Sequence, residues 1–589
     1  MGKEVREVWR ELRRRRVVST AAGYAAAAFV LLQLGEIIFP AFGLGPGALR
    51  GLLALILAGF PVVLALSWVF DITRSGVQRT APAHGEGAPS VGAPRSLDAP
   101  RSLVVFLVLA AGAALGWVGW WSVRVAEQEP PTSERPPSIA VLPFTDLSEA
   151  GDQAYLGDGL AEEILNVLAG VNGLQVAART SSFAFRDRVQ DVRDIGRELN
   201  VAAILEGSLR RTGDHVRVTA QLIDASTGFH IWSENFDRTV DDLFAVQDEI
   251  AGSIVRQLLG RLELSGRTAR REISPEAQDL YWRARAQWSR RDAAGIPGAI
   301  TLFRQAITLD PGYAAAYAGL ADSYALMPLL VPSSSPGDAL AQAEEWAHKS
   351  IALDSTLADP WASLGLVRAM RQDRVGALAA FGKAVELNPS YAPALHWRGN
   401  VLADMGQLPA ALRDAARAAV LDPLSAPVAA DHAAILLWSG DTDAARAEVE
   451  RALSLDFRLQ PALFLSAVVA LEQGREVPLR MSLTQWASMS GLPTQVVPAL
   501  AGAMLSFQRT GDPGEVPPQL RGVTPAQGAI SSGGLASLFA LMGDRDDMLL
   551  WLRRSVDDGS WATQYLGVNR VFEPFRADPE FRSILAELG

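Results

Sequence analysis

The chain has 589 residues, too many for one hydrophobic core, so several domains are expected. It contains no cysteine, which excludes disulfides, thiolate metal sites, iron–sulfur clusters and cysteine nucleophiles. The net charge is −11, and residues 1–16 carry seven Lys/Arg against three Glu, so the acidic remainder disfavours nucleic acid as the main partner.

Three apolar segments predict transmembrane helices, in keeping with a mean hydropathy of +0.13. They are residues 17–39, 49–70 and 102–121, each close to the roughly 20 residues that a helix needs to cross a bilayer. The first could instead be a signal peptide, but it lacks a clear small-residue cleavage site and a second apolar segment follows at once. In the third, Gly112 and Gly116 form a GxxxG pattern that would allow a homodimer, although glycine is common in such helices.

The distribution of basic residues predicts how these segments are oriented in a bacterial inner (cytoplasmic) membrane. Arginines are frequent in residues 1–16 and in the connector 71–101, whereas residues 40–48 hold no Lys or Arg. Because Lys and Arg are retained in the cytoplasm, the N-terminus is expected inside and the chain after residue 122 outside, in the periplasm of a Gram-negative cell. The basic run could also bind anionic lipid or nucleic acid. Residues 122–137 form a proline-rich spacer.

Residues 138–260 alternate short strand and helix patterns, which predicts a small α/β domain with a mixed sheet and a β-meander. A helix over 158–171 is expected to begin with Asp158 as its cap and to place Glu162 and Glu163 in its first turn. Asp191 is expected to cap the next helix. One strand of the meander should place four apolar residues on a single face, namely Val216, Val218, Ala220 and Leu222.

Two groups of polar residues in this domain have both a chemical and a structural reading. His215 and His230 are expected at the starts of neighbouring strands, and no further His or Cys lies near them to complete a metal site. Asp158, Glu162 and Glu163 could form a carboxylate pair, but helix capping explains them better. We therefore expect packing or surface roles for these residues.

The residues of this domain also resemble a known family. The segments "IAVLPF", "LGDGLAEEILNVL", "VAARTSSFAFRD" and "VRVTAQLIDASTGFHIWSENFDRT" are similar to the TolB amino-terminal-like (FlgO-like) domain of bacterial membrane-anchored tetratricopeptide-repeat proteins. The resemblance implies a non-catalytic envelope module that makes protein contacts. Related proteins can carry a winged-helix DNA-binding domain or a nucleotide cyclase domain at their N-terminus; with about 16 residues before the first span, neither is expected here.

A repeat of 34 residues is the strongest pattern in the chain. Asp354, Asn388, Asp422 and Asp456 end similar segments at this constant interval, which is the tetratricopeptide period. Asp310 lies 44 residues before Asp354, so a ten-residue loop at 327–336 is expected. The pattern predicts an all-α solenoid over residues 275–470, followed by degenerate helical repeats and a C-terminal cap over 471–589.

The first helices of such repeats usually line a concave face that receives a partner peptide. By register, five residues are expected there: Tyr281, Trp288, Asp322, His396 and Asn400. An ordinary solvated face is the alternative reading of each. The Lys and Asn pattern that clamps a C-terminal carboxylate in some of these proteins is absent, so such a ligand is not indicated.

No catalytic, cofactor or metal motif is found. The segment 376–384 imitates a phosphate loop, but its glycines are wrongly spaced, no Ser/Thr follows Lys383, and it lies within a predicted repeat helix. The sequence thus predicts no cofactor and no enzyme activity, and favours a membrane-anchored scaffold or adaptor that binds a protein or peptide. The alternative is a transmembrane receptor that relays a periplasmic state to a separate cytoplasmic regulator.

Overall fold

The structure is a computed structural model of the chain. It describes residues 23–34, 56, 59–60, 70–73, 76–79, 136–186, 188, 190–239, 243–260, 273–331, 335–513, 515–521, 523, 530–557 and 565–588. The chain divides into two compact units, Met1–Ser133 and Glu134–Gly589. Each is considered by itself.

In the first unit, the described residues are few. Residues 23–34 are helical, within the predicted span 17–39. Strands β1 (Phe70–Thr73) and β2 (Gly76–Arg79) form an antiparallel hairpin, so the connector predicted over 71–101 begins with regular structure. Within the described residues no helix combines the length and apolar character needed to span a bilayer. Most of the predicted spans, with Gly112 and Gly116, lie outside the described residues.

The second unit begins with an α/β domain built on a mixed sheet, as predicted. Its elements are β3 (Ser138–Val141), β4 (Thr145–Asp146), α5 (Ala154–Ala169), β5 (Gln175–Val176), α6 (Arg179–Phe183), α7 (Val192–Leu199), β6 (Ala203–Thr212), β7 (His215–Asp224), β8 (His230–Thr239) and α8 (Leu243–Leu259). The strand order is β5-β3-β6-β7-β8, with β4 beside β6. Strands β3, β4 and β5 make parallel pairs, whereas β6, β7 and β8 form the predicted antiparallel meander.

The sheet is covered on both faces because its strands alternate between two cores. Ile139 and Val141 of β3 belong to a core shared with α5 and α8, and Ala140 points to a smaller core with Ile195 and Leu199 of α7. The predicted face of β7 is confirmed, since its four apolar residues are fully buried: Val216, Val218, Ala220 and Leu222. Alternate burial on opposite sides is what a period of two residues requires.

Local sequence signals were right for one helix start and wrong for another. Asp191 caps α7, as predicted, by accepting from the Arg193 backbone N–H at 2.9 Å. Helix α5 instead begins at Ala154, four residues before the predicted cap, so Asp158 and Glu162 lie inside the helix and are buried. His215 and His230 do begin strands, but β7 and β8 run antiparallel, so the two histidines lie at opposite ends of the pair.

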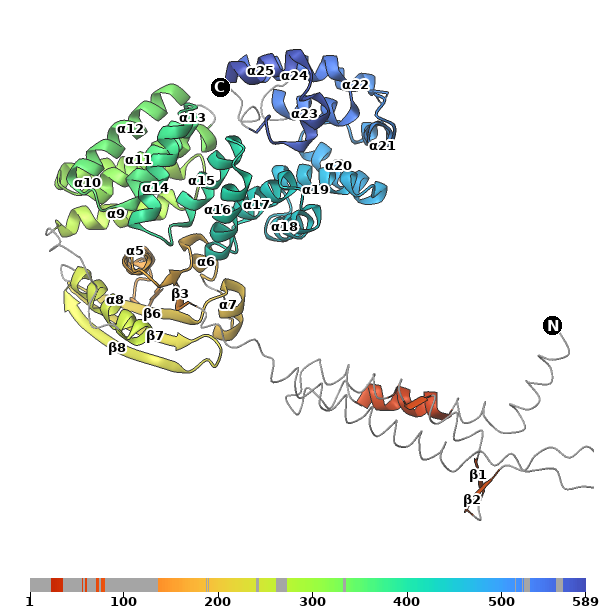
Figure 1. Ribbon diagram of the computed structural model, residues 1–589. Coiled ribbons are helices and arrows are strands. Elements are labelled where there is room, and N and C mark those ends of the chain that lie inside the picture. The colour runs from red at the N-terminus through yellow and green to blue at the C-terminus, as the bar shows by residue number, and fades with distance from the viewer. Residues whose placement is uncertain are drawn as a thin grey trace, which may run out of the picture. The chain divides into compact units, whose positions relative to one another are not determined.

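The rest of the second unit is a series of helix pairs (Figure 1). They are α9 (Pro275–Trp288) with α10 (Gly295–Leu309), α11 (Ala314–Leu330) with α12 (Pro336–Leu353), α13 (Ala358–Met370) with α14 (Arg374–Leu387), α15 (Ala392–Asp404) with α16 (Leu408–Leu421), α17 (Ala426–Trp438) with α18 (Thr442–Leu455), and α19 (Gln460–Glu472) with α20 (Glu476–Met489). The predicted repeat end at residue 470 falls inside α19, so the regular series continues to Met489.

The ten-residue insertion is not the loop that was expected. Helix α11 has 17 residues where α13 has 13, and α12 has 18 where α14 has 14. Most of the insertion therefore lengthens both helices of the second pair, and Pro328 lies inside α11 near its end. The segment 376–384 lies within α14, as predicted.

Beyond α20 the helices are less regular. They are the 3-10 helix η2 (Thr494–Val496), α21 (Val497–Thr510), α22 (Pro518–Arg521), α23 (Ser532–Met542), α24 (Arg545–Asp557), the 3-10 helix η4 (Arg570–Phe575) and α25 (Pro579–Leu588). The tail does more than cap the last pair. The Leu588 carbonyl accepts from Arg374 of α14 at 3.2 Å, and the Tyr565 ring lies 4.8 Å from that of Trp438 in α17. The final residues thus contact helices near the middle of the repeats.

Close packing within each pair explains the small residues of the repeat. A Cβ added to Gly365 of α13 would lie 2.7 Å from the Phe381 ring of α14, whereas one added to Gly382 would meet nothing within 4 Å. Glycine at residue 365 is therefore required by the neighbouring ring, and glycine at residue 382 is not.

Gly365→Ala should destabilise the protein by about 1–3 kcal/mol, because the Phe381 ring must leave its position. Gly382→Ala is the matched control in the same repeat, and it should stabilise by up to about 1 kcal/mol through helix propensity. The urea midpoint of unfolding measures both. Equal effects of the two substitutions would contradict the packing argument.

Candidate functional site

The α/β domain packs directly against the first helices of the repeats. Helix α5 lies beside α9 (Figure 1). The core on this face of the sheet continues into an apolar cluster with buried residues of α9 to α15. Gly159 of α5 fits against Trp282 of α9, where an added Cβ would lie 2.4 Å from the indole. We call this contact between the two domains the junction.

A buried carboxylate links the two domains at the junction. Glu162 of α5 accepts from Arg179 of α6 at 3.0 Å and from Arg285 of α9 at 2.8 Å, and its side chain is 6% exposed. Burial alone would raise the pKa of Glu162, but the two guanidinium groups outweigh it and hold the pKa below its ordinary value. Glu162 is therefore ionised and neutralises charge on both sides of the junction.

Backbone and hydroxyl contacts continue the junction toward the middle of the repeats. Ala178 N–H donates to the Leu421 carbonyl at 2.7 Å, and Ser181 Oγ donates to Asp422 at 2.5 Å. Val176 N–H donates to the hydroxyl of Ser390 at 3.3 Å. Asp422 ends a repeat at the 34-residue period. The same residue also binds the α/β domain through Ser181.

Three of the predicted groove residues lie at or near the junction. Tyr281 is 6% exposed and packs between Phe303 and Tyr313, so it is a core residue. Trp288 is 7% exposed, and its ring centroid lies 4.4 Å from the guanidinium carbons of both Arg285 and Arg291. The rings of Tyr281 and Trp288 are therefore part of the interior of the first repeat.

Asp322 of α11 is a partly buried carboxylate in the same region. It accepts from Ser363 at 3.1 Å and lies 3.9 Å from Arg285. Desolvation raises its pKa to about 6, although the positive charge of Arg285 acts in the opposite direction. Asp359 of α13 also has a raised pKa because of burial, and it accepts from the Tyr391 hydroxyl at 3.2 Å.

The other two predicted residues form a separate cluster. His396 Nε2 and Asn400 Nδ2 of α15 each lie 2.7 Å from the same carboxylate oxygen of Asp431 in α17. Both are buried, and their contact with Asp431 links adjacent repeats. Among the residues that the structure describes, no three His, Asp or Glu side chains are grouped to hold a metal ion.

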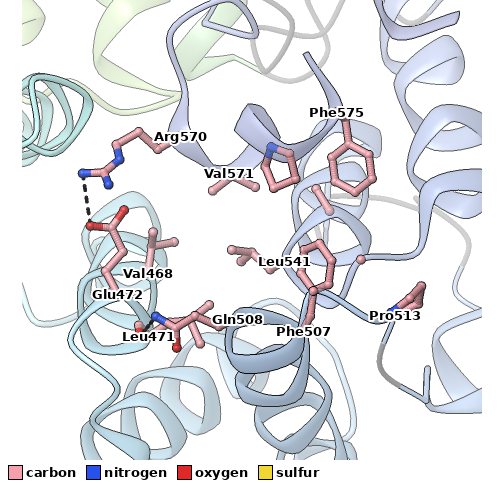
Figure 2. Close-up of a pocket in the computed structure, with 14 residues that line it drawn as sticks. Val468, Leu471, Glu472, Phe507, Gln508, Pro513, Leu541, Arg570, Val571 and Phe575 are labelled. Carbon is pink, nitrogen blue, oxygen red and sulfur yellow. Dashed lines mark hydrogen bonds and ion pairs between the residues drawn. The ribbon is translucent and has the colours of Figure 1, made fainter. Parts of the chain in front are cut away.

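A cavity of about 580 Å³ lies among the C-terminal helices (Figure 2). Its wall is mainly apolar, with Val468 and Leu471 of α19 facing Phe507 of α21 and Phe575 of η4. Arg570 and Glu472 form an ion pair of 3.4 Å at one side. Such a wall suits an apolar group, and none of the residues predicted to bind a partner lines this cavity.

The first part of the second unit is similar to a known protein family. Residues 134–253 match the family described as "HilA/YgeH-like transcriptional regulator, second domain". The match overlaps the predicted α/β domain 138–260, under a description different from the TolB-like one.

One curated relative is a Rhizobium meliloti protein named "Putative adenylate cyclase 3". It is 42% identical over 200 residues, which are 33% of this chain and 34% of the relative. The chain therefore spans about a third of that relative's length.

Solved structures of tetratricopeptide proteins are also similar to parts of the chain. TTC0263 of Thermus thermophilus is 21% identical, with a TM-score of 0.28, over 33% of this chain and 99% of its own. PilF of Pseudomonas aeruginosa is 17% identical, with a TM-score of 0.29, over 47% of this chain and 98% of its own. The repeat architecture itself follows from the helix pairs and their period.

Glu162→Gln should destabilise the second unit by about 3–5 kcal/mol, because it leaves the buried Arg285 and the partly buried Arg179 without their shared counter-charge. Folding lowers the pKa of Glu162. The stability difference between wild type and Glu162→Gln should therefore be fully present above the pKa that this carboxyl has in the unfolded chain, and it should disappear as the pH falls through the folded pKa. Urea unfolding followed by circular dichroism measures this. Glu450→Gln, which removes one partner of an exposed ion pair, is the control and should change stability much less.

Asp322→Asn should stabilise the protein more at pH 7.5 than at pH 5. The folded pKa of Asp322 is about 6 and so lies above the value of the unfolded chain. Ionisation therefore costs stability as pH rises through this window, and asparagine removes that cost. Thermal unfolding of both proteins at the two pH values measures the difference. A gain that is equal at both pH values would show that Asp322 does not titrate there.

Proposed function

We propose that this chain is a membrane-anchored envelope scaffold that binds protein partners through its repeats. The observation that carries the proposal is the series of six helix pairs, of which the last four recur at a 34-residue period, because such stacked hairpins expose long surfaces suited to binding polypeptides. The α/β domain is the second part of the scaffold. In this proposal it is a TolB-like module, held rigidly to the repeats by the junction.

The proposed location rests on the sequence of the first unit. The three apolar segments would anchor the chain in the bilayer, and the arginines before the first segment would keep the N-terminus in the cytoplasm. The α/β domain and the repeats would then lie in the periplasm. The GxxxG pattern at Gly112 and Gly116 would bring two copies together.

The surface proposed for partners lies away from the junction. The junction and the tail already contact several first helices, but apolar side chains are exposed at the fifth and sixth pairs. Val477 and Met481 lie one turn apart on α20 and are 69% and 68% exposed, and Phe457 nearby in sequence is 66% exposed. Apolar residues that stay exposed in a group are typical of contact surfaces.

A signalling role is the second candidate, and the comparisons favour it. Residues 134–253 match a domain of transcriptional regulators, and the curated relative is named for a cyclase. The shared module would then sense or relay a periplasmic state, and the third apolar segment would pass it to a separate cytoplasmic regulator.

Photo-crosslinking in living cells tests the proposal. A crosslinking residue at Met481 should capture a defined periplasmic protein, identified by mass spectrometry, whereas one at Glu450, which is also exposed, should not. A reporter that is active only after export should be active when fused after residue 125 and silent at residue 85.

Each outcome separates the candidates. Capture of a cytoplasmic regulator by probes in residues 71–101 would favour signalling. A silent reporter after residue 125 would refute the periplasmic scaffold, because the repeats would then lie in the cytoplasm.

A further inference from the structure

A tyrosine of the C-terminal tail, residues 565–588, lies in a groove between repeat helices. The ring of Tyr565 packs on Trp438 at the end of α17, with 4.8 Å between the ring centroids. It also contacts a small apolar cluster that α15, α16 and α17 form. The space left beside the ring is only about 10 Å³, too small for more than a single water molecule. The side chain of Tyr565 therefore fills this groove.

The groove belongs to the surface on which a partner peptide was predicted. Residues of α13, α14 and α15 line it, namely Ala369, Arg374, Trp397, Asn400, Val401 and Asp404. Asn400 is one of the five predicted contact residues, and it donates to Asp431 of α17 at 2.7 Å. Burial raises the pKa of Tyr565 well above its ordinary value, and the charges of Asp431 and Asp404 act in the same direction. The groove thus combines an apolar wall for an aromatic ring with carboxylates whose charge reaches the hydroxyl.

Tyr565 can leave the groove without opening the C-terminal core. Among the described residues of the tail, only Tyr565 belongs to the groove cluster. Its neighbour Leu566 and the rings of Phe572 and Phe581 are at most 1% exposed and belong to a different apolar cluster, which extends from α17 to α25. These downstream residues would keep the tail folded if the side chain of Tyr565 were displaced.

Two hydrogen bonds to backbone carbonyls add to the contact between the tail and the middle repeats. Arg374 of α14 donates to the Leu588 carbonyl at 3.2 Å, and Arg570 of the tail donates to the Leu437 carbonyl at 3.4 Å. Both are longer than the 2.9–3.0 Å typical of N–H···O bonds, at roughly the upper end of the usual range. The ring of Tyr565 is therefore the main anchor of the tail in this groove.

We propose that the groove binds a tyrosine of the partner protein and that Tyr565 occupies it when no partner is bound. This inference rests on the proposed scaffold function and adds a second contact to the exposed side chains of α20. The chain's own tyrosine shows which side chain the groove accepts. Because Tyr565 is tethered, it competes at an effective concentration in roughly the millimolar range, so the tail keeps weak ligands out.

The test uses the full-length protein in nanodiscs and a fluorescein-labelled peptide, GGYLGVN, which carries residues 565–569. Fluorescence polarisation measures its binding. Tyr565→Ala empties the groove and removes the tethered competitor, so this variant should bind the peptide at least about tenfold more tightly than wild type does. A peptide with alanine in place of tyrosine should not bind. The double variant Tyr565→Ala/Trp438→Ala lacks the ring on which the tyrosine packs, and it should not bind either.

The second helix pair offers a matched control. Tyr317 of α11 also packs on a tryptophan, Trp346 of α12, with 5.8 Å between the ring centroids. Tyr317→Ala makes the same change outside the groove and should bind the peptide as weakly as wild type does. Circular dichroism shows whether each variant is folded. If Tyr565→Ala is not, Tyr565→Leu keeps an apolar side chain, removes the ring contact and should also bind the peptide more tightly than wild type.

Equal binding by wild type and the Tyr565 variants, or binding that persists without Trp438, would overturn the proposed groove. Capture of a partner at Met481 does not depend on Tyr565, so failure of this inference and failure of the scaffold function give different patterns.

Discussion

The arrangement of the second unit depends on one buried carboxylate and its two cations. Glu162 projects from the α/β domain into a space where Arg179 and Arg285 converge from opposite domains. A buried guanidinium without a counter-charge would destabilise the folded state. Each domain therefore needs the other to balance the charge that the junction buries. The apolar core around α5 and α9 adds the attraction, and the ion pairs fix which surfaces meet.

This contact changes how the repeats can function. In a free solenoid the first helices would be open to a peptide, but here α5, α6 and the final residues of the chain contact α9 and the turns or helices from α14 to α17. The residues expected in an open groove are consequently buried or paired with neighbouring repeats. Among the described residues, the exposed apolar side chains of α20 and the cavity beside Phe507 stay available.

Periodicity predicted the architecture because it reports a local rule that every repeat obeys. The interval between Asp354 and Asn388 located the helix pairs, and the alternation in β7 located its buried face. The role of Glu162 could not be predicted, since its partner Arg285 lies 123 positions away and a helix dipole offered a sufficient local explanation. The ten-residue insertion was predicted as a loop because its prolines and serines favour one. Helix α11 packs against α13 and continues through Pro328, and local sequence does not reveal such packing.

The core that the two domains share also affects when the α/β domain can complete its fold during synthesis. The α/β domain is synthesised first, yet the outer side of α5 is covered by helices that begin more than a hundred residues later, at α9. Until then Gly159 and its neighbours face solvent, and Glu162 has only one of its two cations. A ribosome-bound chain would therefore hold an incomplete domain with an exposed apolar surface, the condition under which chaperones bind nascent chains.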